Sequence, residues 1–395
     1  MIKKLIVLLL ITLALLVLGI LIWWVGPLIK IGELTPLGSE LVRAVLIGLI
    51  VLVVVGRAIW RRLRTRKASK QLSDSLMQAP AARPAAAAEN AEQKVLDTRF
   101  TEAVATLKQM RLSAAGKKPG WRDWLSLSGG NYLYDLPWYV FIGAPGAGKT
   151  TALVNSGLSF PLAEKFGPGA IRGVGGTRNC DWWFTDDAVL IDTAGRYTTQ
   201  DSHQSEDKGA WDAFLALLKK VRPRRPLNGV FLSISVGDLL TQGPEQRATL
   251  AASIRARLQE LDEKLATRLP VYVMVTKTDL LYGFTDYFDD LGKEQRAQVF
   301  GFTLTMEEGA KVAQEGIGGA FGREFALLHR RINDGLIARM QRETDGARRA
   351  AIFGFPAQFG SVGPLVAELL EQIFTGSRFA QPPWVRGVYF TSGTQ

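Results

Sequence analysis

Two apolar stretches dominate the N-terminal part of the chain. The first, Leu5–Val25, has 21 residues and no charge, and a helix of this length, rising about 1.5 Å per residue, crosses a hydrocarbon core of roughly 30 Å. The second has an uncharged core of only 13 residues, Ala44–Gly56. Arg43 and Arg57 can extend their side chains to the interface, so this span lengthens to about Leu41–Trp60. The pattern predicts a two-helix transmembrane hairpin, with one span followed by an interfacial helix as the alternative.

Farther along, the hydrophobic pattern indicates alternating strands and helices. Short β-prone runs occur at 138–142, 188–191, 231–236 and 271–275, separated by helical stretches. This is typical of a mostly parallel sheet covered by helices on both faces, so we predict an α/β, three-layer core. Along the chain we expect the hairpin with its basic flank at 1–62 and an Ala/Pro-rich linker at 63–95. A helical lead-in at 96–130, the core at 131–280 and a helical extension with late strands at 281–395 follow.

Two helical stripes support the flanking parts. Apolar residues recur at helical spacing in the lead-in and in the extension, and we interpret both stripes as packing surfaces. They are Phe100, Val104, Leu107 and Met110 in the lead-in and Phe325, Leu328, Ile332, Leu336 and Met340 in the extension. Ala351–Phe355 is a candidate late strand.

Charge adds a membrane topology. Seven of the basic residues lie without an acid in residues 57–70 (RAIWRRLRTRKASK), whereas the whole chain has a net charge of +11. Together with Lys3 and Lys4, this cluster predicts that both ends of the hairpin are cytoplasmic, with an outer loop at 26–40. The cluster can also attract anionic lipid of the bilayer, and no nucleic-acid motif accompanies it, so we expect no nucleic-acid partner.

Composition excludes two classes of chemistry. The chain has one cysteine, Cys180, and two histidines. An internal disulfide framework is therefore impossible, and a Cys/His zinc site is improbable. The candidate chemistry lies instead in glycine-rich and acidic loops after the predicted strands.

The first of these loops is a phosphate-binding motif. Residues 143–150 read GAPGAGKT directly after the run 138–142, and match GxxxxGK[ST] at every fixed position. Backbone amides would surround the β-phosphate, Lys149 would bridge phosphate oxygens, and the Thr150 hydroxyl would bind Mg²⁺. The residues expected around the phosphates are Gly143, Gly146, Ala147, Gly148, Lys149, Thr150 and Thr151.

The second motif follows the run 188–191. Residues 192–195 read DTAG, and an acid at that strand end can hold Mg²⁺, as a Walker-B Asp does. Asp192 and Thr150 are thus the candidate metal ligands, and the Gly195 amide can approach the γ-phosphate without a Cβ in the way. Arg196 could stabilise transition-state charge or form a salt bridge. Because no obvious residue orients a water molecule, we expect slow hydrolysis.

A third motif concerns the base. Residues 276–279 read TKTD, which matches the [NT]KxD motif of P-loop GTPases. Asp279 would accept hydrogen bonds from the guanine N1 and N2 groups, Lys277 would cover the base face, and Thr276 begins the motif. The expected ligand is therefore a nucleoside triphosphate with Mg²⁺. The motif favours GTP, and ATP remains the alternative. No SAK-type guanine loop follows Ala351–Phe355.

Two further positions have open interpretations. Thr177, in the glycine-rich stretch GVGGTRN, is either a switch threonine that reaches Mg²⁺ or a residue of a flexible loop. Asp207 is expected in a solvated loop together with Glu206 and His203. The candidate catalytic residues are therefore Lys149, Thr177, Asp192 and Arg196.

Taken together, four segments resemble the IcmF/TssM family. They are LPWYVFIGAPGAGKTTALVNSGL (136–158), CDWWFTDDAVLIDTAGRYTTQDS (180–202), TKTD (276–279) and RGVYFTSGTQ (386–395). The resemblance implies the N-terminal part of a multi-pass inner-membrane component of the bacterial type VI secretion system, with a P-loop NTPase-like domain in the cytoplasm. It implies a TssL-like partner and self-association in a larger complex, whereas TssJ would bind through a region absent from this chain.

Two alternatives accompany that resemblance. A structural scaffold of the same complex would hold its nucleotide statically or hold none. A targeting GTPase similar to the signal-recognition-particle receptor shares GKTT, DTAGR and TKxD, but the N-terminal hairpin and the segment CDWWFTDD argue against it.

Overall fold

The computed structural model divides the chain into two compact units, residues 1–80 with 124–130 and residues 81–123 with 131–395. The structure describes residues 131–160, 180–200, 204–296, 298–305, 307–309, 312, 316–375 and 383–393, with parts of 21–49 and 96–107. The first predicted span, the basic cluster, the linker and Thr177 lie wholly or mostly outside these residues.

The described part of the first unit is helical. Residues 40–42 and 44–49, within the second predicted span, form helix, and the Ser39 hydroxyl accepts a hydrogen bond from the Val42 amide at 3.3 Å. Several large aliphatic side chains of this helix are exposed, Leu41 to 74% and Val45 to 59%. Trp23 and Trp24 are also helical and exposed.

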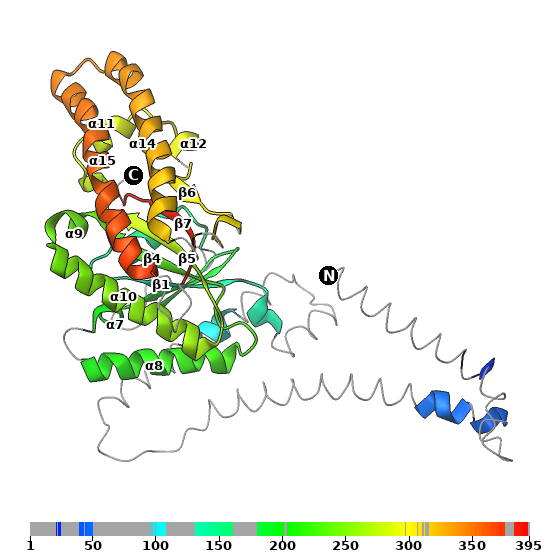
Figure 1. The fold of residues 1–395 in the computed structure, drawn as a ribbon. Helices are drawn as coiled ribbons and strands as arrows, with labels where there is room; N and C mark the ends of the chain where they lie inside the picture. The colour runs from blue at the N-terminus through cyan, green and yellow to red at the C-terminus, as the bar shows by residue number, and fades with distance from the viewer. Residues whose placement is uncertain are drawn as a thin grey trace. The chain divides into compact units, whose positions relative to one another are not determined.

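A seven-stranded sheet forms the centre of the second unit (Figure 1). Its strands are β1 (Trp138–Ile142), β2 (Cys180–Phe184), β3 (Val189–Thr193), β4 (Gly229–Ser235), β5 (Pro270–Thr276), β6 (Gly301–Thr303) and β7 (Trp384–Phe390). They lie in the order β2-β3-β1-β4-β5-β7-β6. The strands from β3 to β7 in that order pair in parallel, whereas the two edge strands, β2 and β6, are antiparallel. The predicted mostly parallel sheet is confirmed.

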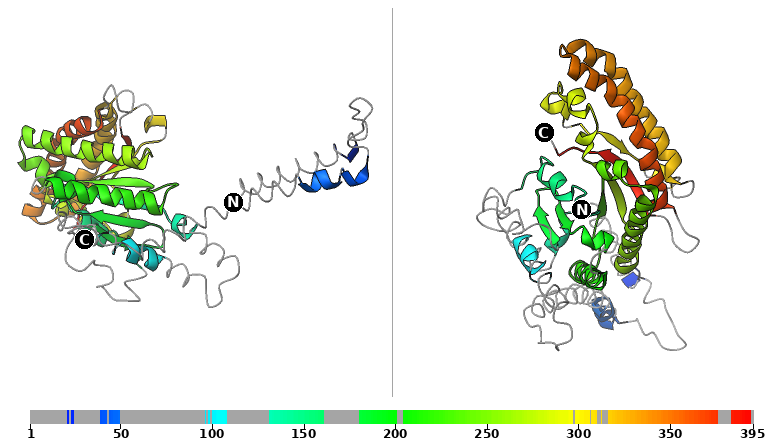
Figure 2. Two further views of the ribbon diagram at one scale, coloured as in Figure 1. Left: turned by 90° about the horizontal axis from the view of Figure 1, so that it is seen from below. Right: turned by 90° about the vertical axis from the view of Figure 1, so that its left-hand side faces the viewer.

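Helices run alongside this sheet (Figure 2). The longer ones are α8 (Gln204–Val221), α10 (Pro244–Leu265), α14 (Ile317–Arg342) and α15 (Gly346–Phe374). The shorter ones are η2 (Asn131–Tyr134), α5 (Lys149–Val154), α7 (Arg196–Thr199), α9 (Val236–Thr241), η4 (Thr278–Leu280), α11 (Phe284–Phe288) and α12 (Lys293–Arg296).

The central strands are buried because they have few polar side chains. Val140, Ile191 and Val273 have no measurable exposure, as expected for parallel strands covered on both sides. On the other face of the sheet, Leu153 of α5 packs in one cluster with Phe141 and Leu190. In the lead-in, residues 100–107 are helical and Phe100 is buried, where its ring meets Trp138 and Trp182.

Two packed helices, α14 and α15, form an arm that extends from the sheet (Figure 1). Asp345 begins α15 by accepting hydrogen bonds from the Ala347 and Arg348 amides at 2.8 and 2.9 Å. These two bonds lower the pKa of the Asp345 carboxyl. The helices approach closely, since a Cβ on Gly363 would lie 2.3 Å from the Phe325 ring.

The candidate late strand Ala351–Phe355 was wrong, because these residues lie inside α15. A short apolar run has no clear period of its own; here Ile352, Phe355, Phe359 and Val362 are buried at helical spacing. The late strands are β6 and β7 instead.

Among the described residues, α15 is the one helix long and apolar enough to cross a membrane. Its buried side chains pack against α10 and α14, and core packing by itself accounts for this composition.

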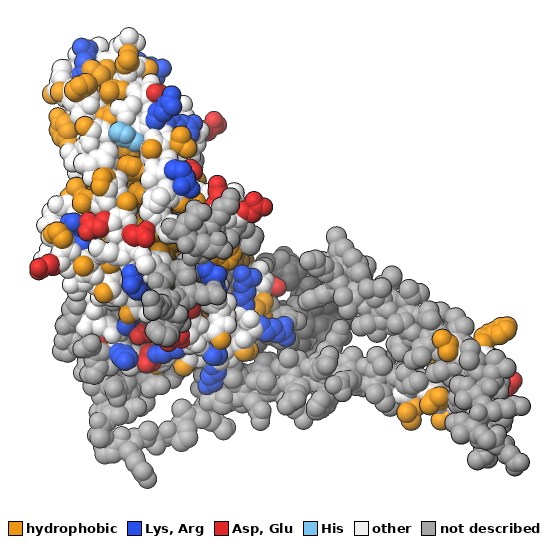
Figure 3. Space-filling model, in the orientation of Figure 1, with side chains coloured by type: hydrophobic (Ala, Val, Ile, Leu, Met, Phe, Trp, Pro, Cys, Tyr) orange, Lys and Arg blue, Asp and Glu red, His pale blue; other side chains and the backbone are white. Residues whose placement is uncertain are grey.

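The face shown in Figure 3 carries apolar side chains among arginines along the arm. Leu327, Ile337 and Phe353 of these two helices are each more than 60% exposed.

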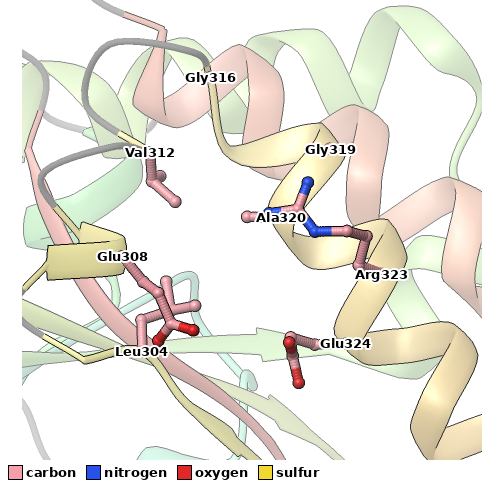
Figure 4. Close-up of a pocket in the computed structure, with 8 residues that line it drawn as sticks. All are labelled: Leu304, Glu308, Val312, Gly316, Gly319, Ala320, Arg323 and Glu324. Atoms are coloured by element: carbon pink, nitrogen blue, oxygen red, sulfur yellow. The ribbon is translucent and has the colours of Figure 1, made fainter.

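A small cavity of about 120 Å³ lies between the segment after β6 and the start of α14 (Figure 4). Glu308 and Arg323 stand on opposite sides of it. It is lined by Leu304, Glu308, Val312, Gly316, Gly319, Ala320, Arg323 and Glu324, none of which belongs to the sequence motifs.

Candidate functional site

The predicted motifs meet at one edge of the sheet. The phosphate loop follows β1, DTAG ends β3, and TKTD begins at the last residue of β5. These three strands are parallel members of one sheet, so their carboxyl ends share an edge. In open α/β sheets, ligands bind in the crevice outside the carboxyl ends of the strands.

Two glycines of the phosphate loop are fixed by their surroundings. Gly143 has φ +151°, and a Cβ there would lie 2.4 Å from the Ser233 carbonyl oxygen of β4. Gly148 has φ +76° and begins α5 as its N-cap, with Thr276 facing it. By contrast, Gly146 has φ +74° but open space around it, and Ala147 is buried.

Lys149 is drawn back onto this loop. Its Nζ donates to the carbonyl oxygens of Gly143 and Ala144 at 2.8 and 3.1 Å, which uses two of the three N–H bonds of the ammonium group. The side chain is only 6% exposed. Burial lowers the pKa of Lys149 to about 8, and the nearby Asp192 carboxylate opposes that shift.

The two candidate metal ligands are in contact. The Thr150 hydroxyl donates a short hydrogen bond to Asp192 Oδ2, although 42 residues separate them in the chain. Asp192 has no exposed surface. Among the described residues there is no cluster of three or more Asp, Glu, His or Cys that could hold a metal. One hydroxyl and one carboxylate fit Mg²⁺ only when phosphate and water oxygens complete its six ligands.

DTAG is packed against the phosphate loop. A Cβ on Gly195 would lie 2.3 Å from the Pro145 nitrogen, so any other residue here would separate the two loops. The phosphate loop is also held from the next helix, because the Gly143 amide donates to the Thr198 hydroxyl of α7 at 3.1 Å. Thr198 is buried.

Arg196 forms a salt bridge with Asp207. The guanidinium lies 2.6 Å from the Asp207 carboxylate and 5.0 Å from the centre of the Tyr197 ring. Asp207 has no exposed surface, so the expectation of a solvated loop was wrong. Helix α8 begins at Gln204 and carries this carboxylate against Arg196 of α7.

The base motif is joined to the phosphate loop through Thr276. Its hydroxyl donates to the Ala147 carbonyl oxygen at 2.8 Å and is 3.2 Å from the Ile234 carbonyl oxygen. Thr276 is buried, and Lys277 adopts a left-handed backbone with φ 59°. Asp279 is partly exposed and accepts a hydrogen bond from the Ser392 hydroxyl at 2.8 Å.

Comparison with known proteins places this chain in a family. A model of the IcmF-related N-terminal domain matches residues 204–395. The type VI secretion system component TssM1 of Pseudomonas aeruginosa is 51% identical over 317 residues, which are 80% of this chain and 27% of that protein. The chain belongs to the IcmF/TssM family.

This IcmF/TssM chain spans about a quarter of the length of the curated relative that it matches. The region matched by the family model contains TKTD, the arm and β7, and begins after DTAG. A crystal structure of an SsGBP variant aligns with 49% of this chain and 55% of its own, at 16% identity and a TM-score of 0.22. This likeness is too weak to support a conclusion about fold or function.

Sequence reasoning missed three residues that shape the site of this family member. Thr198 and Asp207 act through contacts that no motif describes, since both bonds depend on how α7 and α8 turn after DTAG. For Ser392 the sequence did contain a signal: apart from Arg386 and Gly387, residues 384–390 are apolar or aromatic and β-prone, and the polar turn Thr-Ser-Gly follows them.

Proposed function

We propose that this chain is the membrane-anchored, nucleotide-binding part of a type VI secretion TssM component, with a P-loop NTPase-like domain that binds GTP or ATP with Mg²⁺. One observation carries the nucleotide site. Thr150 and Asp192 come from two separate motifs and yet are hydrogen-bonded to each other beside Lys149. Such a meeting of hydroxyl, carboxylate and ammonium is what a magnesium–triphosphate site needs.

Each group has a role in that site. Amides of the phosphate loop and the N-terminal end of α5 would bind the β-phosphate. The third N–H bond of Lys149 would reach the β- and γ-phosphates, and the Gly195 amide would lie near the γ-phosphate. Bound Mg²⁺ would neutralise the charge between the β- and γ-phosphates, with Thr150 as a direct ligand and Asp192 held through water.

Hydrolysis would be slow in this arrangement. Arg196 occupies the position after DTAG, and its guanidinium is paired with the buried Asp207. The Arg196 guanidinium held in this way stabilises the loop after β3. The position that follows DTAG then has no side chain that orients the attacking water. We therefore propose that nucleotide acts by changing the affinity of the chain for its partners, which differs between the nucleotide-bound and the empty state.

The membrane setting rests on the sequence and on the family. The exposed aliphatic side chains of helix 44–49 support a second span. The basic cluster at 57–70 supports a cytoplasmic nucleotide domain and contact with anionic lipid of the inner membrane. A TssL-like inner-membrane protein and further copies of this chain are the proposed partners.

The test is a titration of the full chain in detergent micelles with fluorescent GTP and ATP analogues, with Mg²⁺ and with EDTA. We expect Mg²⁺-dependent binding that weakens at least about 100-fold in Lys149→Ala, because a buried ammonium contact to phosphate is lost. Lys219→Ala is the matched control, since Lys219 is an exposed lysine of α8. Equal binding by wild type and Lys149→Ala would refute the site.

A structural scaffold is the second candidate, and the arm favours it. Exposed Leu327, Ile337 and Phe353 on α14 and α15 are typical of a protein-binding surface. On this hypothesis the chain assembles with its partners equally well without nucleotide. Co-purification of Lys149→Ala with the same partners in the same yield as wild type would support the scaffold over nucleotide control.

A further inference from the structure

A buried acid of β2 lies opposite the candidate magnesium ligand of β3. These two strands pair antiparallel, and Asp181 is in register with Asp192. Asp181 is only 5% exposed, and Asp192 has no exposed surface. Asp181 is the second residue of the segment CDWWFTDD, and none of the three nucleotide motifs includes it.

Both carboxylates lie on the same face of the sheet. Residues directly opposite each other in an antiparallel pair share a face, and every second residue of a strand returns to that face. Two positions along from these acids, Trp183 and Leu190 are in register and pack in one cluster with Leu153 of α5. Asp181 therefore lies on the α5 face of the sheet, next to Asp192.

Thr150 places this pair of acids within the candidate site. Its hydroxyl donates to Asp192 Oδ2, and it is the second residue of α5, directly after Lys149. Opposed side chains of an antiparallel pair have Cβ atoms about 4.5–5.5 Å apart. A hydrated magnesium ion at Thr150 and Asp192 is therefore within reach of the Asp181 carboxylate through a water molecule.

Two such acids are unfavourable in the empty site. Like charges directly opposite each other in a sheet repel, and burial reduces the screening of that repulsion by water. A divalent cation beside both carboxylates turns the repulsion into attraction, and Mg²⁺ typically binds one or two carboxylates together with water and substrate phosphates. A triphosphate without Mg²⁺ has the opposite effect, because it brings further negative charge to two buried acids.

We propose that Asp181 is the second carboxylate of the magnesium site, bound to the ion through water, and that it makes nucleotide binding depend on Mg²⁺. This inference rests on the proposed nucleotide-binding function. It names the species that the site selects, which is the magnesium complex of the nucleotide rather than the free triphosphate.

The experiment measures the affinity of the full chain in detergent micelles for fluorescent GTP and ATP analogues, across a titration of Mg²⁺ and in EDTA. We expect Asp181→Asn to need about tenfold more Mg²⁺ for half-maximal binding, as for the loss of one hydrogen bond to a charged group. In EDTA the variant should bind at least as tightly as wild type, because it removes a negative charge near the triphosphate. The ratio of affinity with Mg²⁺ to affinity in EDTA therefore falls.

A second measurement is the thermal unfolding of the empty chain, followed by tryptophan fluorescence. Asp181→Asn should raise the midpoint by about 2 °C, because the repulsion between two buried carboxylates is removed. Asp181→Ser removes the same carboxylate with a smaller side chain, and tests the Mg²⁺ requirement if Asp181→Asn does not fold.

A matched control separates this effect from a general effect of charge. Asp186→Asn removes the same charge from the exposed turn between β2 and β3, and should leave the Mg²⁺ requirement and the midpoint unchanged.

The remaining outcomes distinguish this inference from the proposed function. An unchanged Mg²⁺ requirement in Asp181→Asn, with nucleotide still bound, would overturn the role of Asp181 and leave the proposed function standing. Equal losses of affinity with Mg²⁺ and in EDTA, together with a lower midpoint, would show a merely structural role and also overturn it. If wild type binds neither nucleotide, this inference and the proposed function are both wrong.

Discussion

The phosphate end and the base end of the candidate site are built in different ways. At the phosphate end, backbone meets backbone: Gly143 lies against Ser233 and Gly195 against Pro145, with no room for a Cβ. At the base end, partly exposed side chains meet across long stretches of sequence, as Asp279 and Ser392 do across 113 residues. We therefore expect the first region to fail by loss of fold, and the second to change selectivity while the fold persists.

The largest expected effect is at Gly143. Gly143→Ala would place a methyl group 2.4 Å from the Ser233 carbonyl oxygen and also strain φ at +151°. We expect a loss of about 3 kcal/mol or more in unfolding free energy, measured by urea unfolding. Gly157→Ala is the matched control: its φ is +69° but nothing lies within 4 Å, so backbone strain alone should cost about 1 kcal/mol. Equal losses of unfolding free energy in the two variants would contradict the view that contact with Ser233 excludes a side chain at Gly143.

The second effect concerns the salt bridge behind DTAG. Asp207→Asn keeps the size of a fully buried side chain but removes the charge that pairs with Arg196. We expect a loss of about 2 kcal/mol in unfolding free energy. Asp212→Asn should change it by less than about 0.5 kcal/mol, because Asp212 and its partner Lys264 are both on the surface. A small effect at Asp207 would mean that this pair does not fix the phosphate end.

The third effect is the uptake of a proton by Lys149 when nucleotide binds. Burial holds the pKa of Lys149 at about 8 against 10.5 for an ordinary lysine, so the buried charge destabilises the empty protein below pH 8. That penalty is relieved as the pH rises from 8 towards 10.5. Bound phosphate should raise the pKa again, and nucleotide binding should then take up close to one proton at pH 9 and little at pH 7. Calorimetry in buffers of different ionisation enthalpy measures this uptake, which Lys149→Met should abolish.

The smallest expected effect lies at the junction of the two ends. Asn155→Ala removes the bond to the Gly393 carbonyl oxygen, and we expect GTP affinity to fall about threefold, the value of one neutral hydrogen bond. Asn333→Ala is the control, because that exposed side chain bonds within α14. A loss of fold in Asn155→Ala, seen by circular dichroism, would contradict the distinction between the two ends.

The same distinction explains what the sequence could predict. The phosphate loop and DTAG are contiguous, and glycine, lysine and an acid at fixed spacing follow directly from phosphate and metal chemistry. The strands before them were found because buried parallel strands are continuous apolar runs. Thus β1 matched its predicted run at both ends, and β3, predicted at 188–191, spans Val189–Thr193.

The base end was only half predictable for the same reason. TKTD is contiguous, but Ser392 reaches it only because β7 is inserted next to β5 rather than at the edge of the sheet. No local pattern specifies that order. Asp207 illustrates the same limit, since an acid in a polar segment gives no sign that a helix will bury it against Arg196.

The most direct test of the central proposal, that one nucleotide binds across both ends and that Asp279 reads its base, is the affinity of wild type and Asp279→Asn for GTP and xanthosine triphosphate with Mg²⁺. An asparagine can donate to the xanthine 2-oxygen, where aspartate accepts from the guanine 2-amino group. The account predicts that wild type prefers GTP and that Asp279→Asn reverses the preference, with Lys149→Ala weakening both nucleotides alike. An unchanged preference in Asp279→Asn would contradict the assignment of the base end.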